Sequence, residues 1–290
     1  MLIDKSGLNS TPTSYHLGYI LGPKLNAPGR IGPSDLAIKL LCSNSISEAT
    51  NLCEEIEELN LKRKEIENNV REEALEKVDK NQAKNSIIWA AAEGWHPGVV
   101  GIVASRLKDK FNKPALVIGF DGIEGKGSGR SVDGYDLGFA IQRLQREGLI
   151  QKGGGHKMAA GLSLKKDQLQ TAMHRLCELA EKDKIITPEA QEVPVDGILF
   201  IQAVKIDLIE DLENCGPFGS AIREPRFAFC DVSISFSKRV GDTHLKVRFS
   251  DDNGKSMDAI CFRAFEGNLG AALAEHLSLI HISEPTRRRG

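Results

Sequence analysis

The sequence predicts an α/β protein in which a long helix joins an N-terminal segment to an α/β domain, and a small β-barrel follows. Three observations support this prediction. Apolar runs at 85–93 and 114–120 flank a helical pattern, the order typical of a βαβ unit with two parallel strands. Residues 47–84 are polar helix formers with one narrow apolar stripe. From residue 192 onwards, short alternating runs are separated by Gly and Asp turns.

Further elements are expected on either side of these runs. A helix from Ser34 precedes the connecting helix, whose many charges form a solvated face with i,i+4 pairs. In the α/β domain, the other predicted elements are a helix that opens at Gly98, helices over 136–146 and 167–182, and a strand over 160–164. In the β-rich part, strands are expected over 193–200, 226–237, 244–250 and 256–262, with a short helix over 205–213.

The composition is that of an ordinary soluble globular protein of about two domains. With 38 basic and 40 acidic residues the net charge is −2, so nucleic-acid binding requires a local basic patch. Six cysteines occur without a C-x-x-C pair, which argues against a zinc ribbon or a disulfide framework and suits a reducing cytoplasm. No apolar run approaches the roughly 20 residues of a membrane span, so a cytoplasmic protein without a membrane partner is expected.

The segment Gly153–Gly161 combines three glycines, one imidazole and several very small side chains. Read as a rigid turn, it would bring backbone N–H groups of Gly154 and Gly155 against an anion, because glycine has no Cβ to keep the anion away. Phosphate is the expected anion, and His156 and Lys157 would add donors. The alternative is an ordinary glycine-rich turn with a capping histidine.

A second glycine-rich segment, Gly125–Ser131, is also interpreted as a turn. Arg130 offers a planar fork of donors for phosphate, and Ser128 and Ser131 add hydroxyl groups. Alone this pattern is weak, because Gly and Ser are common in ordinary hairpins. Two such segments separated by one helical stretch favour a shared phosphate site.

Two further segments are candidates for anion contacts. Residues 22–32 read as a loop broken by Gly and Pro that presents Lys24, Asn26 and Arg30 ahead of a helix N-terminus. A loop with solvated charges is the simpler interpretation of that segment. His96, beside Trp95 and Pro97, is either a ligand contact or a helix cap.

These segments carry a resemblance. Residues 94–161, from the Gly-Trp-His-Pro-Gly-Val run through Gly-Ser-Gly-Arg-Ser to Gly-Gly-Gly-His-Lys-Met-Ala-Ala-Gly, resemble the DHH-associated domain of DHH-family phosphoesterases. Within that family the chain is most similar to the RecJ family of single-stranded-DNA-specific 5′-to-3′ exonucleases of DNA repair and recombination. The resemblance implies that Ser128, Arg130 and His156 hold a DNA phosphate, and that Arg30 approaches the phosphate from the catalytic lobe.

The same resemblance implies a domain order. Residues 1–45 would be the end of the DHH catalytic lobe, 46–85 a connecting helix, and 86–185 the DHH-associated domain. Residues 192–275 resemble an OB-fold, a barrel that binds single strands through basic grooves and stacking aromatic rings, with Lys246 among its basic residues. Residues 278–290 fit no element, resemble translated library adapter, and are interpreted as a tail foreign to the protein.

Enzymes of this family use two divalent cations, Mn²⁺ or Mg²⁺, held by aspartates and the Asp-His-His motif. The sequence contains neither that motif nor an adjacent histidine pair, so no metal ligands and no catalytic residues are expected in this chain. We therefore expect a monomeric fragment that binds single-stranded DNA with little nuclease activity, with a helicase or a single-strand-binding protein as a further partner. The alternatives are a non-catalytic single-strand-binding module, and a DHH phosphodiesterase acting on oligoribonucleotides or cyclic dinucleotides.

Overall fold

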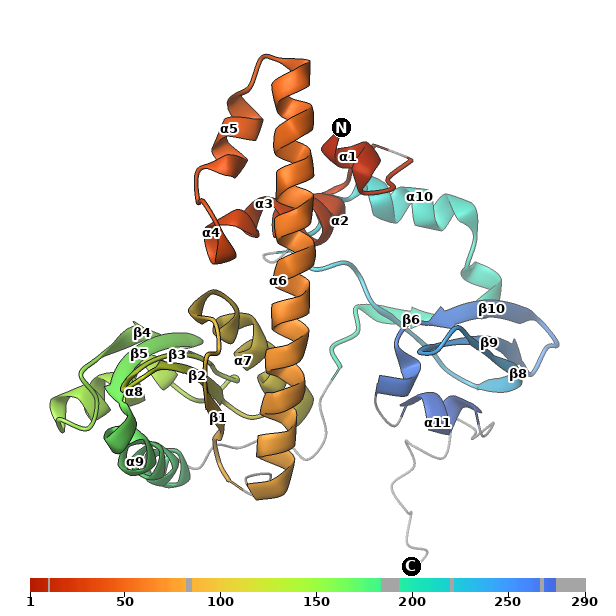
Figure 1. Cartoon of the computed structure of the whole chain (residues 1–290). Helices are drawn as coiled ribbons and strands as arrows, with labels where there is room; N and C mark the ends of the chain where they lie inside the picture. Colours follow the sequence, from red (N-terminus) through yellow and green to blue (C-terminus); the bar gives the residue numbers. More distant parts are fainter. Residues whose placement is uncertain (10, 82–84, 184–192, 220–221, 267–268, 275–290) are drawn as a thin grey trace, which may run out of the picture. The chain divides into compact units, whose positions relative to one another are not determined.

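The computed structural model describes residues 1–9, 11–81, 85–183, 193–219, 222–266 and 269–274 (Figure 1). The chain divides into two compact units, Met1–Gln191 and Glu192–Gly290. None of the described helices is both long and apolar enough to cross a membrane. All six cysteines lie among the described residues, and none of them forms a disulfide. The predicted foreign tail, 278–290, lies outside the described residues.

The first unit begins with short helices. They are α1 (Leu2–Lys5), α2 (Ser14–His16), a π-helical turn (Leu17–Leu21), α3 (Gly22–Asn26), α4 (Pro28–Ile31) and α5 (Leu36–Cys42). The prediction of a loop over 22–32 was therefore wrong, because most of the segment is helical in α3 and α4. Both helices have a proline in their first two positions, where the missing N–H would have had no helical partner.

The long connecting helix is present as α6 (Ile46–Asn81). Its buried side chains recur every three or four residues, which confirms a narrow buried stripe but not one that is apolar throughout; they are Cys53, Ile56, Asn60, Arg63, Glu67, Val70, Ala74 and Val78. The middle of this stripe is polar, and its groups pair with one another: Arg63 donates to Asn60 at 2.7 Å and also bonds Glu67. Lys24 of α3 reaches Glu57 at 2.7 Å and so ties the N-terminal helices to α6.

A five-stranded sheet forms the centre of the first unit. Its strands are β1 (Ile88–Glu93), β2 (Ala115–Asp121), β3 (Glu124–Arg130), β4 (Lys152–His156) and β5 (Ala159–Lys165). Their order is β1-β2-β3-β5-β4. β1 and β2 are parallel and joined through α7 (Pro97–Phe111), which confirms the βαβ unit, whereas all other neighbours are antiparallel.

The predicted glycine-rich turn over 125–131 was wrong, because these residues form strand β3. Its glycines make room for large side chains of the neighbouring strand. A Cβ at Gly127 would lie 2.8 Å from Ile118 Cγ1, and one at Gly129 would lie 2.5 Å from Leu116 Cδ1. Packing, and not chain reversal, therefore explains these glycines.

The three glycines at 153–155 likewise lie in a strand, β4, and the chain reverses only at Lys157 and Met158. A Cβ at Gly153 would lie 2.6 Å from Ile141 Cγ2. Gly155 has φ +156, and a Cβ there would overlap the carbonyl oxygen of Ala159. The prediction of a rigid turn was correct only for the two residues after His156.

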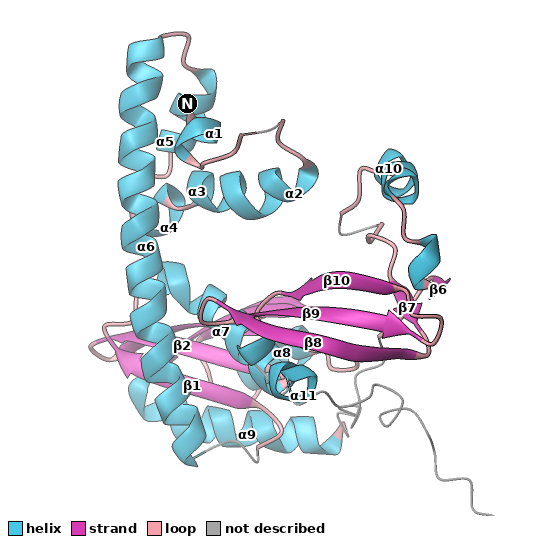
Figure 2. Cartoon of the chain, turned by 90° about the vertical axis from the view of Figure 1, so that its right-hand side faces the viewer, coloured by secondary structure: helices cyan, strands magenta, loops and turns pink. Residues whose placement is uncertain are grey.

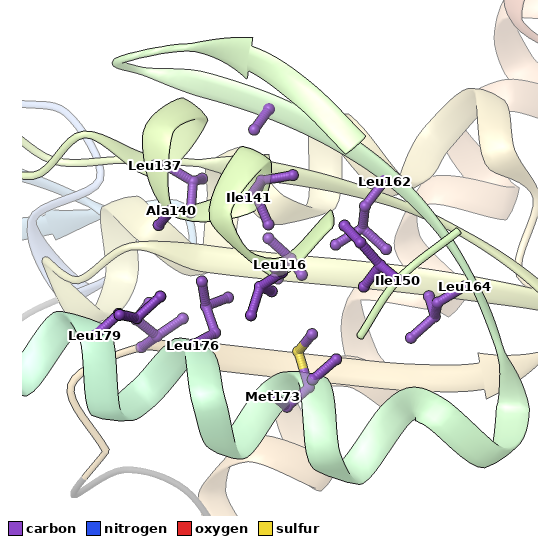
Figure 3. Packing of buried hydrophobic residues seen from close by; sticks show 14 of the residues in the cluster. Leu116, Leu137, Ala140, Ile141, Ile150, Leu162, Leu164, Met173, Leu176 and Leu179 are labelled. Carbon is purple, nitrogen blue, oxygen red and sulfur yellow. The ribbon is translucent and has the colours of Figure 1, made fainter. Parts of the chain in front are cut away.

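Helices cover the two faces of the sheet differently. α8 (Leu137–Arg146) and α9 (Leu169–Lys182) pack on one face, where Figure 3 shows their labelled side chains converging on those of the strands. α8 is capped by Asp136, whose carboxylate accepts from the Phe139 N–H at 2.9 Å. On the other face, α7 and the last turns of α6 pack over Ile88, Ala90, Ala115 and Val117.

The second unit contains two separate small sheets among its described residues, so the predicted barrel is not seen there. β6 (Gly197–Leu199) pairs with β7 (Phe227–Phe229), and β8 (Val232–Val240), β9 (His244–Asp251) and β10 (Ser256–Cys261) form an antiparallel meander (Figure 2). The helices are α10 (Ile206–Asn214) and α11 (Leu269–Ala274). Leu245, Val247 and Leu273 lie in the core between the meander and α11.

Tyr135 lies in the hydrophobic core between the sheet and helices α8 and α9, and it allows the energetics of that core to be tested. Its side chain is 1% exposed, and its hydroxyl has no hydrogen-bond partner among the described residues. Burial, followed by the nearby Asp183, Cys177 and Asp136, raises the pKa of this hydroxyl. Because an unpaired buried hydroxyl is costly, we expect Tyr135→Phe to stabilise the protein by about 1 kcal/mol in urea unfolding.

The same variant should change the alkaline limit of stability. The unfolded chain releases the tyrosine proton near pH 10, whereas folded Tyr135 retains it, so this group lowers stability as the pH rises above about 10. Tyr135→Phe should remove that part of the loss. A variant less stable than the parent at pH 7 would show instead that the hydroxyl is hydrogen-bonded.

Candidate nucleic-acid interface

One face of β4 and β5 is not covered by a helix, and the same face of β3 is partly covered by α7, which lies against Ser128 and Arg130. Along β5 the buried residues are Ala160, Leu162 and Leu164, whereas the residues between them are exposed or half-buried. Directly paired residues of an antiparallel sheet share a face. The strand register therefore assigns eleven residues to this side, which we call the open face: Glu124, Lys126, Ser128 and Arg130 of β3, Ala159, Gly161, Ser163 and Lys165 of β5, and Lys152, Gly154 and His156 of β4.

Charge and size are unevenly distributed on the open face. Five of its eleven residues carry basic side chains, and its one acidic residue, Glu124, lies in the end row opposite Lys165. Gly154 and Gly161 are paired in the middle of the face. A Cβ at Gly154 would meet nothing within 4 Å, so this part of the face is a shallow floor without side chains.

Arg130 and Ser128 lie where the open face meets α7. Arg130 Nη1 donates to Ser128 Oγ at 3.0 Å and to the Gly129 carbonyl at 2.8 Å. A Cβ at Gly101 of α7 would lie 3.0 Å from Ser128 Oγ and 3.2 Å from Arg130 Nη2. The guanidinium is thus held by the strand and fits beside α7 because position 101 has no side chain.

Arg30 reaches the same place from α4. Its Nη1 donates to the Gly98 carbonyl at 3.1 Å, and a Cβ at Gly98 would overlap the Arg30 carbonyl oxygen. Burial, followed by the charge of Arg30, lowers the pKa of Arg130. The Arg130 guanidinium nevertheless stays protonated at neutral pH. No carboxylate among the described residues pairs with either group, so two cations lie near each other without a counter-charge.

His156 ends β4 and lies on the open face opposite Ala159, which in turn pairs with Arg130. The hairpin after it is held by its own backbone. The Lys157 carbonyl accepts from the Leu137 N–H at 3.1 Å, and the Met158 carbonyl accepts from the Ser131 N–H at 2.9 Å. The imidazole is therefore exposed on a rigid support.

The other predicted site residues are located as follows. Ser131 is buried, and its hydroxyl donates to the Tyr135 carbonyl at 2.8 Å, so it is not presented to a ligand. Gly155 is required by the local backbone, whereas Gly154 is open. Asn26 is exposed at the end of α3, and Lys157 is exposed in the hairpin.

His96 acts as a helix cap. Its Nδ1 accepts from the Gly98 N–H at 3.0 Å at the start of α7, which confirms the capping interpretation. Its neighbour Trp95 donates to Glu73 of α6 at 2.8 Å. The Gly-Trp-His-Pro-Gly motif therefore fixes α7 against α6 and α4 at the edge of the site.

Lys246 lies in the second unit, on β9. Its ammonium pairs with Asp258 of β10 at 2.9 Å, and Arg248 pairs with the same carboxylate at 2.6 Å. Arg248 and then Lys246 hold the pKa of Asp258 well below its usual range. Two basic groups therefore share one carboxylate, so the net positive charge at this place on β9 and β10 is smaller than the basic residues alone would give.

Sequence reasoning missed four residues that shape this site. Gly98 and Gly101 were read only as part of a helix, yet they admit Arg30 and Arg130. Lys126 and Lys152 lie on the open face and were not singled out. Their alternation with glycine and serine in β3 and β4 was the available signal, but the turn interpretation concealed it.

The donor set does not suit a divalent cation. Arginine and lysine carry no lone pair for a metal at neutral pH, and Mg²⁺ and Mn²⁺ prefer oxygen ligands. In the part of the chain that the structure describes, no group of three or more His, Cys, Asp or Glu side chains could hold a metal ion.

Comparison with known proteins identifies two domains in the chain. Residues 84–182 match the DHHA1 domain family, and residues 195–282 match the RecJ OB domain family. The chain belongs to the RecJ exonuclease family. It is 33% identical over 272 residues to the single-stranded-DNA-specific exonuclease RecJ of Bacillus subtilis, and 36% identical over 255 residues to that of Escherichia coli.

The match covers most of this chain but less than half of either relative. It spans 91% of the chain and 34% of the Bacillus subtilis RecJ, and 85% of the chain and 44% of the Escherichia coli RecJ. The RecJ OB match ends at residue 282, beyond position 278, so the limit of the predicted foreign tail stays a prediction.

Solved RecJ structures share the fold. The manganese complex of RecJ from Thermus thermophilus superposes with a TM-score of 0.76 at 24% identity, over 90% of this chain and 38% of that chain. A further exonuclease RecJ bound to manganese gives a TM-score of 0.54 at 26% identity, over 62% of this chain and 44% of that chain.

The glycines of β4 allow the ligand site to be separated from the fold. Because Gly154 has open space on its outer side, we expect Gly154→Ala to leave the free energy of unfolding unchanged or to raise it by up to about 1 kcal/mol. The melting temperature should therefore stay the same or rise slightly. A methyl group on the floor should nevertheless weaken binding of a single strand several-fold. Fluorescence anisotropy with a labelled oligonucleotide measures the effect.

Gly153→Ala is the matched control. It adds the same methyl group to the other face, against Ile141 and Ile150, and should lower stability by about 1–3 kcal/mol. If Gly154→Ala bound DNA as tightly as the parent, close approach of a ligand to the glycine floor would be disproved.

Proposed function

We propose that this chain supplies the DNA-binding part of a RecJ-type exonuclease, which degrades single-stranded DNA from its 5′ end. The open face supports this proposal. It combines five basic side chains with a glycine floor, and its one acidic residue, Glu124, lies in the row farthest from Arg130. A phosphodiester backbone needs both features, because it is anionic and must approach the sheet closely.

Each residue has a distinct role in this proposal. Arg130 offers its guanidinium as a fork to two phosphate oxygens, and Ser128 holds that fork in place through the 3.0 Å hydrogen bond. Arg30 adds a second positive charge from α4, and His156 contributes an exposed ring from β4. Lys157 and Asn26 are further candidates at the margin, whereas Ser131 supports the hairpin.

The contribution of these groups to hydrolysis is positional and electrostatic. Holding the phosphate aligns the scissile bond, and the guanidinium groups neutralise charge that develops in the transition state. Mn²⁺ or Mg²⁺ would activate water in the complete enzyme. The residues of the open face do not suit such ions, so we assign no metal-bound step and no catalytic residue to this chain.

The domain limits predicted from the sequence are part of the proposal, with the end of a catalytic lobe at 1–45 and a connecting helix at 46–85. A DHH phosphodiesterase for oligoribonucleotides or cyclic dinucleotides is the first alternative. The RecJ OB match after the DHHA1 match favours DNA exonuclease over this alternative. A cytoplasmic monomer, helped by a helicase or a single-strand-binding protein, remains the expected setting.

Binding of a 5′-phosphorylated, labelled single strand tests the proposal. The full chain should bind, and its affinity should fall with rising salt because bound cations are released from the DNA. Arg130→Ala/His156→Ala should bind at least about tenfold more weakly, as expected when charge-assisted phosphate contacts are lost. Mn²⁺ is included, and product lengths are followed on a gel; we expect no shortening.

The matched control is Arg146→Ala/His174→Ala, which removes the same residue types from exposed positions on α8 and α9. It should bind like the parent. Equal loss in both double variants, or no binding by the parent chain, would contradict the proposed role of the open face. A shortened strand would contradict the absence of catalytic residues. It would also rule out the alternative of a single-strand-binding module without nuclease activity.

A further inference from the structure

We propose that the open face holds a second phosphate of the same strand, at a subsite made by Lys126, Ser163 and Lys152. This inference rests on the proposed function, because it extends the DNA path beyond the Arg130 site. It adds binding residues and sets a minimum length for a tightly bound strand.

The register of three strands places these residues together. Lys126 of β3 pairs with Ser163 of β5, and Ser163 pairs with Lys152 of β4. All three therefore share the side of the sheet occupied by Arg130 and His156. Two ammonium groups flank one hydroxyl, a donor set that suits a phosphate.

Rows of paired residues cross the open face at regular intervals. The Lys126 row is followed by the Ser128–Gly161–Gly154 row and then by the row of Arg130 and His156. Neighbouring rows are two strand residues apart, so the outer rows are separated by about 13 Å. At about 3.4 Å per nucleotide a stacked strand covers this distance in roughly four nucleotides, and a stretched strand in fewer.

The middle row lets the strand pass between the two cationic rows. Gly154 and Gly161 put no side chain in the way, and a Cβ at Gly161 would have only one neighbour, the Gly127 carbonyl oxygen at 3.8 Å. Among the described residues, neither Lys126 nor Lys152 forms an ion pair. Their charges are therefore available to a ligand.

The path ends in the next row. Glu124 lies opposite Lys165 there, and Glu124 Oε1 accepts from Gln151 Nε2 at 3.4 Å. The carboxylate of Glu124 offsets the charge of Lys165, so this row offers no net positive charge to a further phosphate. The open face therefore offers two cationic rows, with no reason for a third.

Oligothymidylates of two and eight nucleotides, both 5′-phosphorylated, test the second subsite. Lys126→Gln/Lys152→Gln should bind the dinucleotide like the parent, because the Arg130 row is intact. It should bind the octanucleotide about tenfold more weakly, and the slope of log K against log salt should fall by about 1. Lys110→Gln/Lys182→Gln, with equal charge loss at exposed positions of α7 and α9, should match the parent in both assays.

The outcomes separate the two proposals. If the parent does not bind the octanucleotide, or if Arg130→Ala/His156→Ala binds it equally well, the proposed function fails and the subsite fails with it. If that variant loses binding while Lys126→Gln/Lys152→Gln equals its control, only the second subsite is overturned. Equal weakening of the dinucleotide and the octanucleotide would also overturn it, because the lysines would then act on the first phosphate. Melting temperatures establish that all variants fold.

Discussion

The absence of side chains at the glycine positions of β3, β4 and β5 is the constraint on which the first unit depends. Toward α8 and α9, Gly127, Gly129 and Gly153 leave space for large apolar side chains, and a methyl group at any of them would overlap a neighbour. Toward the other side, Gly154 and Gly161 face open space. Glycine therefore serves packing on one face of the same strands and leaves a floor on the other. Because β4 and β5 pack against helices on one face only, their other face is available for a ligand.

The start of α7 converts this floor into a charged site. Trp95 bonds Glu73 of α6, and His96 caps the helix, so the first turn of α7 is fixed in place. Gly98 then receives the backbone of α4, and Gly101 leaves room for Arg130. Through these contacts, Arg30 is brought near the guanidinium of Arg130, which lies 100 positions later in the sequence. Positioning of the cations therefore depends on helix packing more than on loop conformation.

The sequence predicted the elements with a clear period and misread those rich in glycine. The βαβ unit and α6 followed from apolar spacing, because burial on a helix or a parallel strand leaves a periodic pattern. The glycine-rich sequences of β3 and β4 predict turns, because glycine is a local signal for chain reversal. In the fold, these glycines instead make room for Ile118, Leu116 and Ile141 on other elements. The proximity of Arg30 and Arg130 and the burial of Ser131 are likewise tertiary facts without a local signal. The barrel was inferred from strand spacing, which does not encode how two sheets close.

The charge distribution of the folded chain supports a ligand site over a purely structural one. Several buried or half-buried basic groups elsewhere in the first unit are neutralised, as where Lys24 meets Glu57 and where Arg175 meets Glu147 and Glu178. Arg130, in contrast, is half-buried beside Arg30, and both effects lower its pKa. A fold gains nothing in stability from two neighbouring cations without a counter-charge, so the arrangement is a cost in the unbound protein. A bound phosphate removes that cost, which makes part of its binding energy the relief of repulsion already present in the fold.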